Sequence, residues 1–266
     1  MKYIIIFLFT LSICQTWDYK KHGDDWKNNF PECNKSQISP MKINSKEAEK
    51  ISSKYYFFPK MNKNIKGKLQ LMEQDNLLVL NYPEKSLGEL MFKIKFYLNE
   101  KIKDGEFINL NCHSISFKIP GEHIFNNKKY DAELQVNCTD KYKGELIRTF
   151  VSIPIVKVND TQEQSHIFDE INNSIQDKKL PIDITIKDFK DFLDVYTMMD
   201  NVYYYLGHLN YPPCSNNVYW FFVERNLKIK ENILMKLNNY LNKEKCPEGN
   251  NRNAFNKEKD TDLFCY

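Results

Sequence analysis

The feature that most constrains the fold is a series of short runs in which apolar and polar residues alternate. The runs are rich in β-branched and aromatic side chains, and Gly or Asn-Asn turns separate some of them. Alternation with a period of two is typical of strands that bury one face. The clearest runs cover residues 68–82, 91–99, 113–119, 130–137, 149–158 and 217–224. They predict a mainly β protein with a largely antiparallel sheet.

A few helices are expected on the surface of this sheet. One is predicted by Ile167, Phe168, Ile171 and Ile175, which fall on one helical face, with Thr161 as a candidate N-cap. A second stripe repeats every four residues and comprises Ile229, Ile233, Leu237 and Leu241, widened by Leu234. Residues 189–200 are ambiguous between helix and strand. Asn126 and Asn127 predict a hairpin turn, because Asn tolerates a positive φ.

The N-terminus predicts export from the cell. Lys2 precedes an apolar run from Tyr3 to Leu11, followed by small or polar residues, which is the order of a secretory signal peptide. The run is too short to span a bilayer. We therefore expect residues 1–14 to be removed and a secreted chain to begin at Gln15. A retained N-terminal anchor is the alternative.

Cysteine usage agrees with an oxidising compartment. Beyond Cys14, six cysteines remain, an even number that favours disulfides over free thiols. The sequence contains no C-x-x-C pair, so a cysteine zinc site is not expected. They are Cys33, Cys112, Cys138, Cys214, Cys246 and Cys265. Four sequons allow N-glycosylation in that compartment. These sequons begin at Asn34, Asn137, Asn159 and Asn172.

The composition bounds the architecture and the class of partner. Of the 266 residues, 42% are hydrophobic and 14% aromatic, so the chain can bury a substantial core. There is no internal repeat, linker or composition break, which predicts a single domain over residues 15–266. The net charge of +3 is too balanced to indicate nucleic acid.

Three blocks of residues carry a resemblance to one family. The first block is "TWDYKKHGDDWKNNFPECNKSQISPMKI", residues 16–43. The second block is "YYYLGHLNYPPCSNNVYWFF", residues 203–222. The third block is "SISFKIPGEHIFNNKKYDAELQV", residues 114–136. Together they resemble the α-carbonic anhydrases, whose matching motifs are W-x-Y…Q-S-P, Y-x-G…P-P-C-S…W and F-H-F-H…E-H…K-x-Y-x-x-E-x-H. Near the C-terminus, "GNNRNAF" is weakly similar to the family's N-x-R-P motif. The blocks occur in the family's order across the whole mature chain.

The resemblance implies a fold and a disulfide. The family fold is a single domain with a central, largely antiparallel, twisted sheet of ten strands and a catalytic zinc at the bottom of a conical cavity. It also implies a disulfide between Cys33 and Cys214. Cys112 and Cys138 would lie on adjacent strands and could form a second disulfide. Their offsets from the cavity positions differ in parity, which argues against this pair. Cys246 and Cys265 then remain as a pair by elimination.

The family's three zinc-binding histidines are absent. The matching positions are Ser116, Lys118 and Gln135. Alternation places Ser116 and Lys118 on one face of a strand, and Glu133 and Gln135 on one face of its partner. A protonated Lys offers hydrogen-bond donors only, and Ser and Gln are poor zinc ligands. The sequence therefore predicts no zinc, and no other cofactor is indicated.

Other positions of the family's active site also differ. The resemblance matches the Thr that orients the zinc-bound hydroxide to Asn210, the following Thr to Tyr211, and the proton-shuttle His to Glu89. Glu122 and His123 are retained, and we interpret both as buried hydrogen-bonding groups.

Lys118 is expected to take the place of the metal as a fixed cation. It would then pair with Glu133 or Glu122, because an unpaired buried ammonium is costly. The alternative is that its amine extends up a wet cavity towards solvent.

Two classes of function remain open. The leading prediction is a secreted pseudoenzyme that acts as a binding or structural protein, as the catalytically silent members of this family do. Its partner, a protein or an assembly, is not identified by the sequence. An anionic surface or glycan is a further candidate partner, through a loop that contains Lys60, Lys63, Lys66 and Lys68. The alternative is an active carbonic anhydrase with unusual metal ligation.

Overall fold

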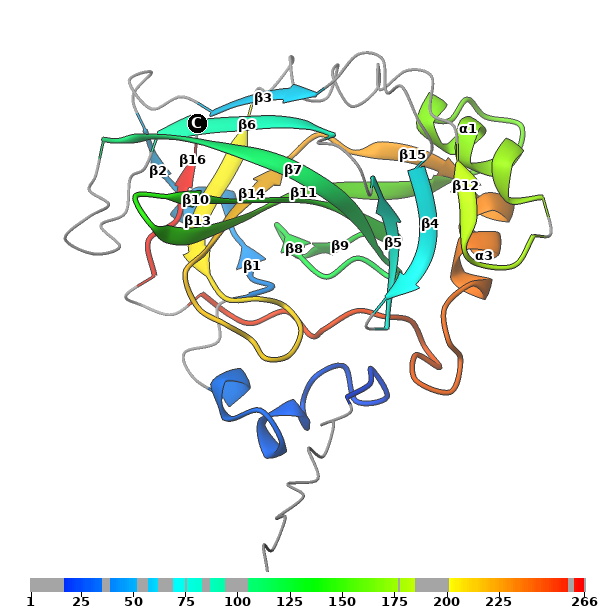
Figure 1. Ribbon diagram of the computed structural model, residues 1–266, viewed down its shortest axis with the longest axis horizontal. Coiled ribbons are helices and arrows are strands. Elements are labelled where there is room, and N and C mark those ends of the chain that lie inside the picture. The colour runs from blue at the N-terminus through cyan, green and yellow to red at the C-terminus, as the bar shows by residue number, and fades with distance from the viewer. Residues whose placement is uncertain are drawn as a thin grey trace, which may run out of the picture.

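A computed structural model shows a β-sheet protein with two helices gathered at one end of the sheet (Figure 1). It describes residues 17–34, 39–51, 57–61, 69–74, 76–82, 87–93, 105–176, 178–184, 201–257 and 261–265, with only the backbone for 57–61 and Lys93. The predicted signal peptide, the loop lysines Lys63, Lys66 and Lys68, and the ambiguous segment 189–200 lie outside these ranges. Lys60 lies in β3 and its side chain is not described.

Sixteen strands, two α-helices and three short 3-10 helices make up the described secondary structure. The strands are β1 (Lys42–Ile43), β2 (Glu49–Lys50), β3 (Phe57–Met61), β4 (Leu69–Gln74), β5 (Leu77–Asn81), β6 (Gly88–Lys93), β7 (Phe107–Lys118), β8 (Ile124–Phe125), β9 (Lys128–Lys129), β10 (Ala132–Tyr142), β11 (Glu145–Val158), β12 (Ile182–Ile184), β13 (Val202–Gly207), β14 (Val218–Val223), β15 (Leu227–Lys230) and β16 (Phe264–Cys265). The helices are α1 (His166–Ile175) and α3 (Glu231–Asn239). None of the described helices is long and apolar enough to cross a membrane.

The main sheet is larger than the expected ten strands. Within the described residues, its continuous row does contain ten strands, in the order β12-β4-β5-β7-β10-β11-β14-β13-β16-β2, and β3, β6 and β15 bring the total to thirteen. Most pairings are antiparallel, whereas β11 pairs in parallel with β14 and β15, and β16 with β2. A separate three-stranded sheet consists of β1, β8 and β9. The predicted class, a mainly β domain with a few surface helices, is confirmed.

Both helices follow the predicted apolar stripes, with different beginnings. The residue that precedes α1 is Ser165, so the expectation of Thr161 as N-cap is wrong. Ile229 belongs to β15 and α3 begins at Glu231. The turn between β8 and β9 is as predicted, since Asn126 and Asn127 have φ values of 47° and 64°.

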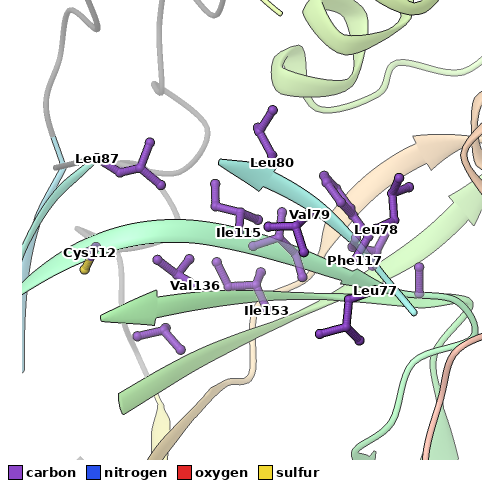
Figure 2. Close-up of a cluster of buried hydrophobic side chains, with 14 of the residues drawn as sticks. Leu77, Leu78, Val79, Leu80, Leu87, Cys112, Ile115, Phe117, Val136 and Ile153 are labelled. Carbon is purple, nitrogen blue, oxygen red and sulfur yellow. The ribbon is translucent and has the colours of Figure 1, made fainter. Parts of the chain in front are cut away.

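Among the described residues, two hydrophobic clusters pack against the main sheet. Strand β14 is buried at all six positions and divides its side chains between the clusters, with Phe221 in one and Trp220 in the other. The first cluster includes Ile115, Phe117 and residues from α1 and α3. Figure 2 shows part of it, where side chains of β5, β7, β10 and β11 meet. Alternate residues of β7 are thus fixed in this core, and the intervening residues point to the opposite face.

Two disulfides join distant or adjacent segments. Cys33 bonds to Cys214, which ties the N-terminal segment to the loop before β14, as the resemblance implied. Cys112 bonds to Cys138 across β7 and β10. The pairing register shifts by one residue there, because Asn137 pairs with Ser114 and Cys138 with Cys112. This β-bulge at His113 removes the mismatch in parity and brings the two cysteines face to face.

The expected pair of Cys246 and Cys265 is wrong. Neither cysteine forms a disulfide, and both are buried. Cys246 belongs to the first hydrophobic cluster and Cys265 to the second, in β16 beside Tyr203. A disulfide needs Cα atoms within about 7 Å of each other, which elimination by sequence does not test.

Candidate functional site

The side chains at the family's ligand positions lie together on adjacent strands. In the β7–β10 pair, Ser116 is opposite Gln135 and Lys118 is opposite Glu133. Directly opposed residues in an antiparallel pair point to the same face. The four side chains therefore form one patch on the face opposite Ile115 and Phe117, where the sequence placed them.

Lys118 is completely buried in this patch and its amine is fully engaged. Its Nζ lies 2.9 Å from Oε1 of Glu122 and donates to the hydroxyl of Tyr19 at 2.8 Å. Nζ also lies 5.0 Å from the centre of the Tyr19 ring, a cation–π contact. The expected pairing is confirmed for Glu122, and the alternative of an amine extended towards solvent is wrong, since no part of the side chain is exposed.

The ionisation of Lys118 is set by two opposing effects. Burial lowers the pKa of Lys118, whereas the charge of Glu122 and the hydrogen bond to it favour the protonated amine. Burial and the same carboxylate raise the pKa of Tyr19 well above its usual value, so its hydroxyl stays neutral and can accept from the amine.

Glu122 is the centre of the first polar cluster, which we call the Glu122 cluster. Its Oε1 accepts from Lys118 and from the backbone N–H of Arg252 at 2.8 Å. Its Oε2 accepts from Nε2 of Gln135 at 3.1 Å and from Nδ2 of Asn210. Each carboxylate oxygen thus has two donors, and the charge is balanced by Lys118.

Gln135 is saturated by its neighbours. Its two N–H groups go to Glu122 and to Oε1 of Glu133, the latter at 2.7 Å. Its carbonyl oxygen accepts from Asn210 at 3.0 Å. The side chain therefore links two buried carboxylates and presents no free group to a ligand.

Glu133 is the centre of a second polar cluster, the Glu133 cluster. Its Oε1 accepts from Nδ1 of His123 at 2.8 Å and from Ser152, and its Oε2 accepts the backbone N–H groups of Glu122 and His123. Nε2 of His123 lies 2.7 Å from the hydroxyl of Tyr205. Burial raises the pKa of Glu133, but the charge of His123 and the hydrogen bonds from His123 and Gln135 outweigh it and leave the pKa at about 2.

The cavity beside Ser116 is small. It measures about 90 Å³ and its described lining contains neither a histidine nor a carboxylate. Tyr211 forms one wall and stacks on Trp17 with ring centres 6.2 Å apart. Because a water takes up about 30 Å³ of liquid, only a few waters fit in this space.

Glu89 is not brought into this site. It lies in β6 opposite Asn111, five residues along β7 from Ser116, or roughly 16 Å at the usual strand rise. Its side chain is exposed, and Nδ2 of Asn109 is 3.5 Å from its carboxylate. The match of Glu89 to a proton-shuttle position is therefore not supported by its surroundings.

Sequence reasoning missed three residues that complete the Glu122 cluster. Asn250 bonds both the backbone N–H of Ile119 and the carbonyl of Phe117, holding the end of β7 in place. Arg252 donates its backbone N–H to Glu122, and Tyr19 accepts from Lys118. The weak "GNNRNAF" motif was the available signal for Asn250 and Arg252. Gly249 lets this segment approach, because a Cβ there would clash with the carbonyl of Ile119.

The donor set at the ligand positions does not fit a catalytic zinc. Such a site needs three side chains with lone pairs directed at the metal and one open position. Lys118 directs an ammonium group at Glu122, the oxygen of Gln135 is engaged with Asn210, and Ser116 is a neutral hydroxyl. Within the described ranges, no group of three or more His, Cys, Asp or Glu side chains is arranged to hold a metal ion.

Comparisons with known proteins agree with this fold. The chain is 24% identical to "Carbonic anhydrase 6" of Canis lupus familiaris over 241 residues, which cover 84% of this chain and 71% of that protein. It is similar in structure to a halotolerant carbonic anhydrase from Dunaliella salina, with a TM-score of 0.73, 15% identity and coverage of 94% and 97% of the two chains. It is also similar to dioscorin complexed with ascorbate, with a TM-score of 0.69, 16% identity and coverage of 95% and 98%.

The family model described as "Eukaryotic-type carbonic anhydrase" matches residues 21–259, which is most of the sequence. This match includes both polar clusters except Tyr19, together with Cys33 and Cys214. The chain belongs to the eukaryotic-type carbonic anhydrase family.

Proposed function

We propose that this chain is a secreted carbonic anhydrase-like pseudoenzyme that acts as a binding or structural protein and does not hydrate CO2 through zinc. The observation that carries the proposal is the buried ion pair of Lys118 and Glu122, with 2.9 Å between Nζ and Oε1, at a ligand position of the family. A dication next to this ammonium would be repelled, and moving the ammonium away would leave Glu122 without its charge partner.

The groups around the cavity support the same proposal. Zinc-dependent hydration requires a metal-bound water in a space that CO2 can enter. Here Tyr211 and Phe150 line a space of about 90 Å³, and Asn210 directs its N–H groups at Glu122 and Gln135. The family's Thr at this position has a hydroxyl, which accepts from one group while it donates to another. Asn210 has no such hydroxyl.

Secretion is supported by the two disulfides and the signal-like N-terminus. Disulfides persist in oxidising compartments and are rare in the cytosol. A role as a binding or structural protein follows from the loss of the catalytic groups in a fold whose core is complete.

A hydration assay with matched variants tests the proposal. The wild-type chain, assayed by stopped flow with added zinc, is expected to show no CO2 hydration above the uncatalysed rate. The triple variant Ser116→His/Lys118→His/Gln135→His restores three imidazoles and is expected to gain metal, without full activity while Asn210 stays. Hydration by the wild-type chain at an enzymatic rate would overturn the proposal and favour an active enzyme with unusual ligation.

A further inference from the structure

A row of three residues crosses the small sheet of β1, β8 and β9. Lys42 is paired with Ile124, and Ile124 with Lys129. Residues in register on adjacent strands point to the same face. Two strand spacings separate the outer strands, so Lys42 and Lys129 rise about 10 Å apart on either side of Ile124. The other row is anchored in the core, since Ile43 and Phe125 are buried.

Two hollows meet along this row. The first has a volume of about 610 Å³, and its basic lining residues are Lys42, Lys46 and Lys257. The second has a volume of about 330 Å³ and is lined by Lys42, Lys129 and Arg252. Lys42 and Ile124 line both hollows, so the two hollows adjoin at this row and together form one surface. We call this surface the Lys42 face.

The Lys42 face has an excess of positive charge. Its described lining contains four lysines and the acidic residues Glu47 and Glu122, whereas the guanidinium of Arg252 is buried and donates to the backbone carbonyls of Ser39 and Cys33. Glu122 is neutralised from inside by Lys118. Lys42, Lys46 and Lys129 are exposed, and none has a carboxylate within 4.0 Å among the described residues. The whole chain has a net charge of only +3, so this concentration is a local feature and not a reflection of the average surface.

Exposed amide side chains surround the lysines. Asn44, Asn126, Asn127 and Asn256 line the first hollow, and Asn253 lines the second. Asn44 and Asn253 already donate within the protein, to Glu47 and Asp24. The NH2 groups of Asn126, Asn127 and Asn256 can donate to hydroxyl groups, whereas a lysine ammonium binds sulfate or carboxylate groups. This combination suits a polymer that carries hydroxyl groups and anionic groups along its length.

We propose that the Lys42 face binds an acidic polysaccharide, with sulfate or carboxylate groups held by Lys42, Lys46 and Lys129. The two hollows and the amide lining favour a saccharide chain over a flat anionic membrane. The exposed large apolar side chains of the described residues, Met91, Phe107, Leu146 and Met235, line neither hollow, so the face offers nothing to insert into a bilayer. This inference rests on the proposed role as a binding protein and names its ligand class.

Binding of a heparin dodecasaccharide to the full chain, measured by calorimetry at physiological salt, tests the inference. The wild-type protein is expected to bind, and Lys42→Gln/Lys129→Gln is expected to bind at least about tenfold more weakly, the equivalent of about 1.4 kcal/mol. The matched control is Lys141→Gln/Lys228→Gln, which removes two exposed lysines elsewhere and is expected to bind like the wild type. Binding should weaken as salt rises, because the contacts are between exposed charges.

Three outcomes would overturn the inference. They are an absence of heparin binding, an equal loss of binding in both double variants, and binding to phosphatidylserine vesicles in preference to the dodecasaccharide. All four lysines are exposed, so the variants are expected to keep the wild-type melting temperature. Metal content and CO2 hydration are measured on the same samples. A protein without zinc or activity that fails to bind heparin loses this inference alone, whereas zinc-dependent activity overturns the proposed function.

Discussion

The Glu122 and Glu133 clusters lie side by side, with Lys118 on β7, Glu133 and Gln135 on β10, and Glu122 in the loop that follows β7, yet their partners have different origins. In the Glu133 cluster, the carboxylate and His123 match one motif of the family, and Tyr205 matches the Tyr of the Y-x-G motif. In the Glu122 cluster, the carboxylate is retained while Lys118, Gln135 and Asn210 stand where the family has other residues. Both carboxylates nevertheless have a donor on each oxygen.

The comparison shows which constraint has been kept. Buried polar groups must be paired whether or not a metal is present, so the frame persists while the groups at the ligand positions change. Gln135 joins the two clusters, because it donates to both carboxylates. Networks of this kind are sensitive to the loss of one member.

The largest effect is expected for Lys118→Met. Removing one partner of a buried ion pair costs about 3–5 kcal/mol of unfolding free energy, because the other charge stays buried and unpaired. The double variant Lys118→Met/Glu122→Gln, which removes both charges, is expected to recover much of that loss. Urea denaturation followed by circular dichroism measures all three proteins.

A surface ion pair provides the control for this cycle. Lys157 lies 2.6 Å from Glu231, but both side chains are about half exposed. Lys157→Met is expected to leave the midpoint of denaturation unchanged. If Lys118→Met were equally harmless, the Glu122 cluster would not depend on its cation.

Acid is expected to affect the Glu133 cluster next. The pKa of Glu133 is about 2 in the folded protein against about 4.5 for a free glutamate, so the unfolded chain binds the proton first. Its contribution to stability, about 3 kcal/mol, is present above pH 4.5 and is lost as the pH falls towards 2. Unfolding free energy measured from pH 6 to pH 2 should fall less steeply in Glu133→Gln. Parallel curves for the two proteins would show that Glu133 does not titrate in this way.

A smaller effect is expected for Tyr211→Ala, which widens the cavity. Tyr211 is partly buried, lines the cavity and stacks on Trp17. Loss of this aromatic contact should cost about 1–2 kcal/mol. Thermal denaturation measures the loss, and an unchanged melting temperature would mean that Tyr211 does not help to close the cavity.

The smallest effect is expected for Glu89→Gln. The side chain is exposed and distant from both clusters, so the unfolding free energy should change by less than about 0.5 kcal/mol. The variant therefore tests whether Glu89 belongs to the site. A loss as large as that of Lys118→Met would place Glu89 in the same network.

Much of the site could be predicted because strand periodicity is a local property. Spacing placed Ser116 and Lys118 on one face of a strand and Glu133 and Gln135 on one face of its partner. The cost of an unpaired ammonium predicted a carboxylate partner for Lys118. Choosing Glu122 over Glu133 needed the structure. Glu133 is directly opposite Lys118 in register but directs its oxygens at His123 and two backbone N–H groups.

The errors arose where distant segments meet. The pairing of Cys246 with Cys265 assumed that leftover cysteines are neighbours, whereas the fold buries them in different clusters. The bulge at His113 reverses the alternation of β7 without a sequence signal, and it explains how Cys112 reaches Cys138. Asn250 and Arg252 lie more than a hundred residues from β7, and only the fold brings them under Glu122.

The amount of zinc held by the purified chain tests the central claim most directly. Protein expressed in zinc-supplemented medium and freed of loosely bound metal is analysed by elemental mass spectrometry, beside the variant with three restored histidines. We expect far less than one zinc per wild-type chain and a clear gain in the variant. One tightly held zinc per wild-type chain would contradict the account, because Lys118 could not then keep its ion pair with Glu122 at a ligand position.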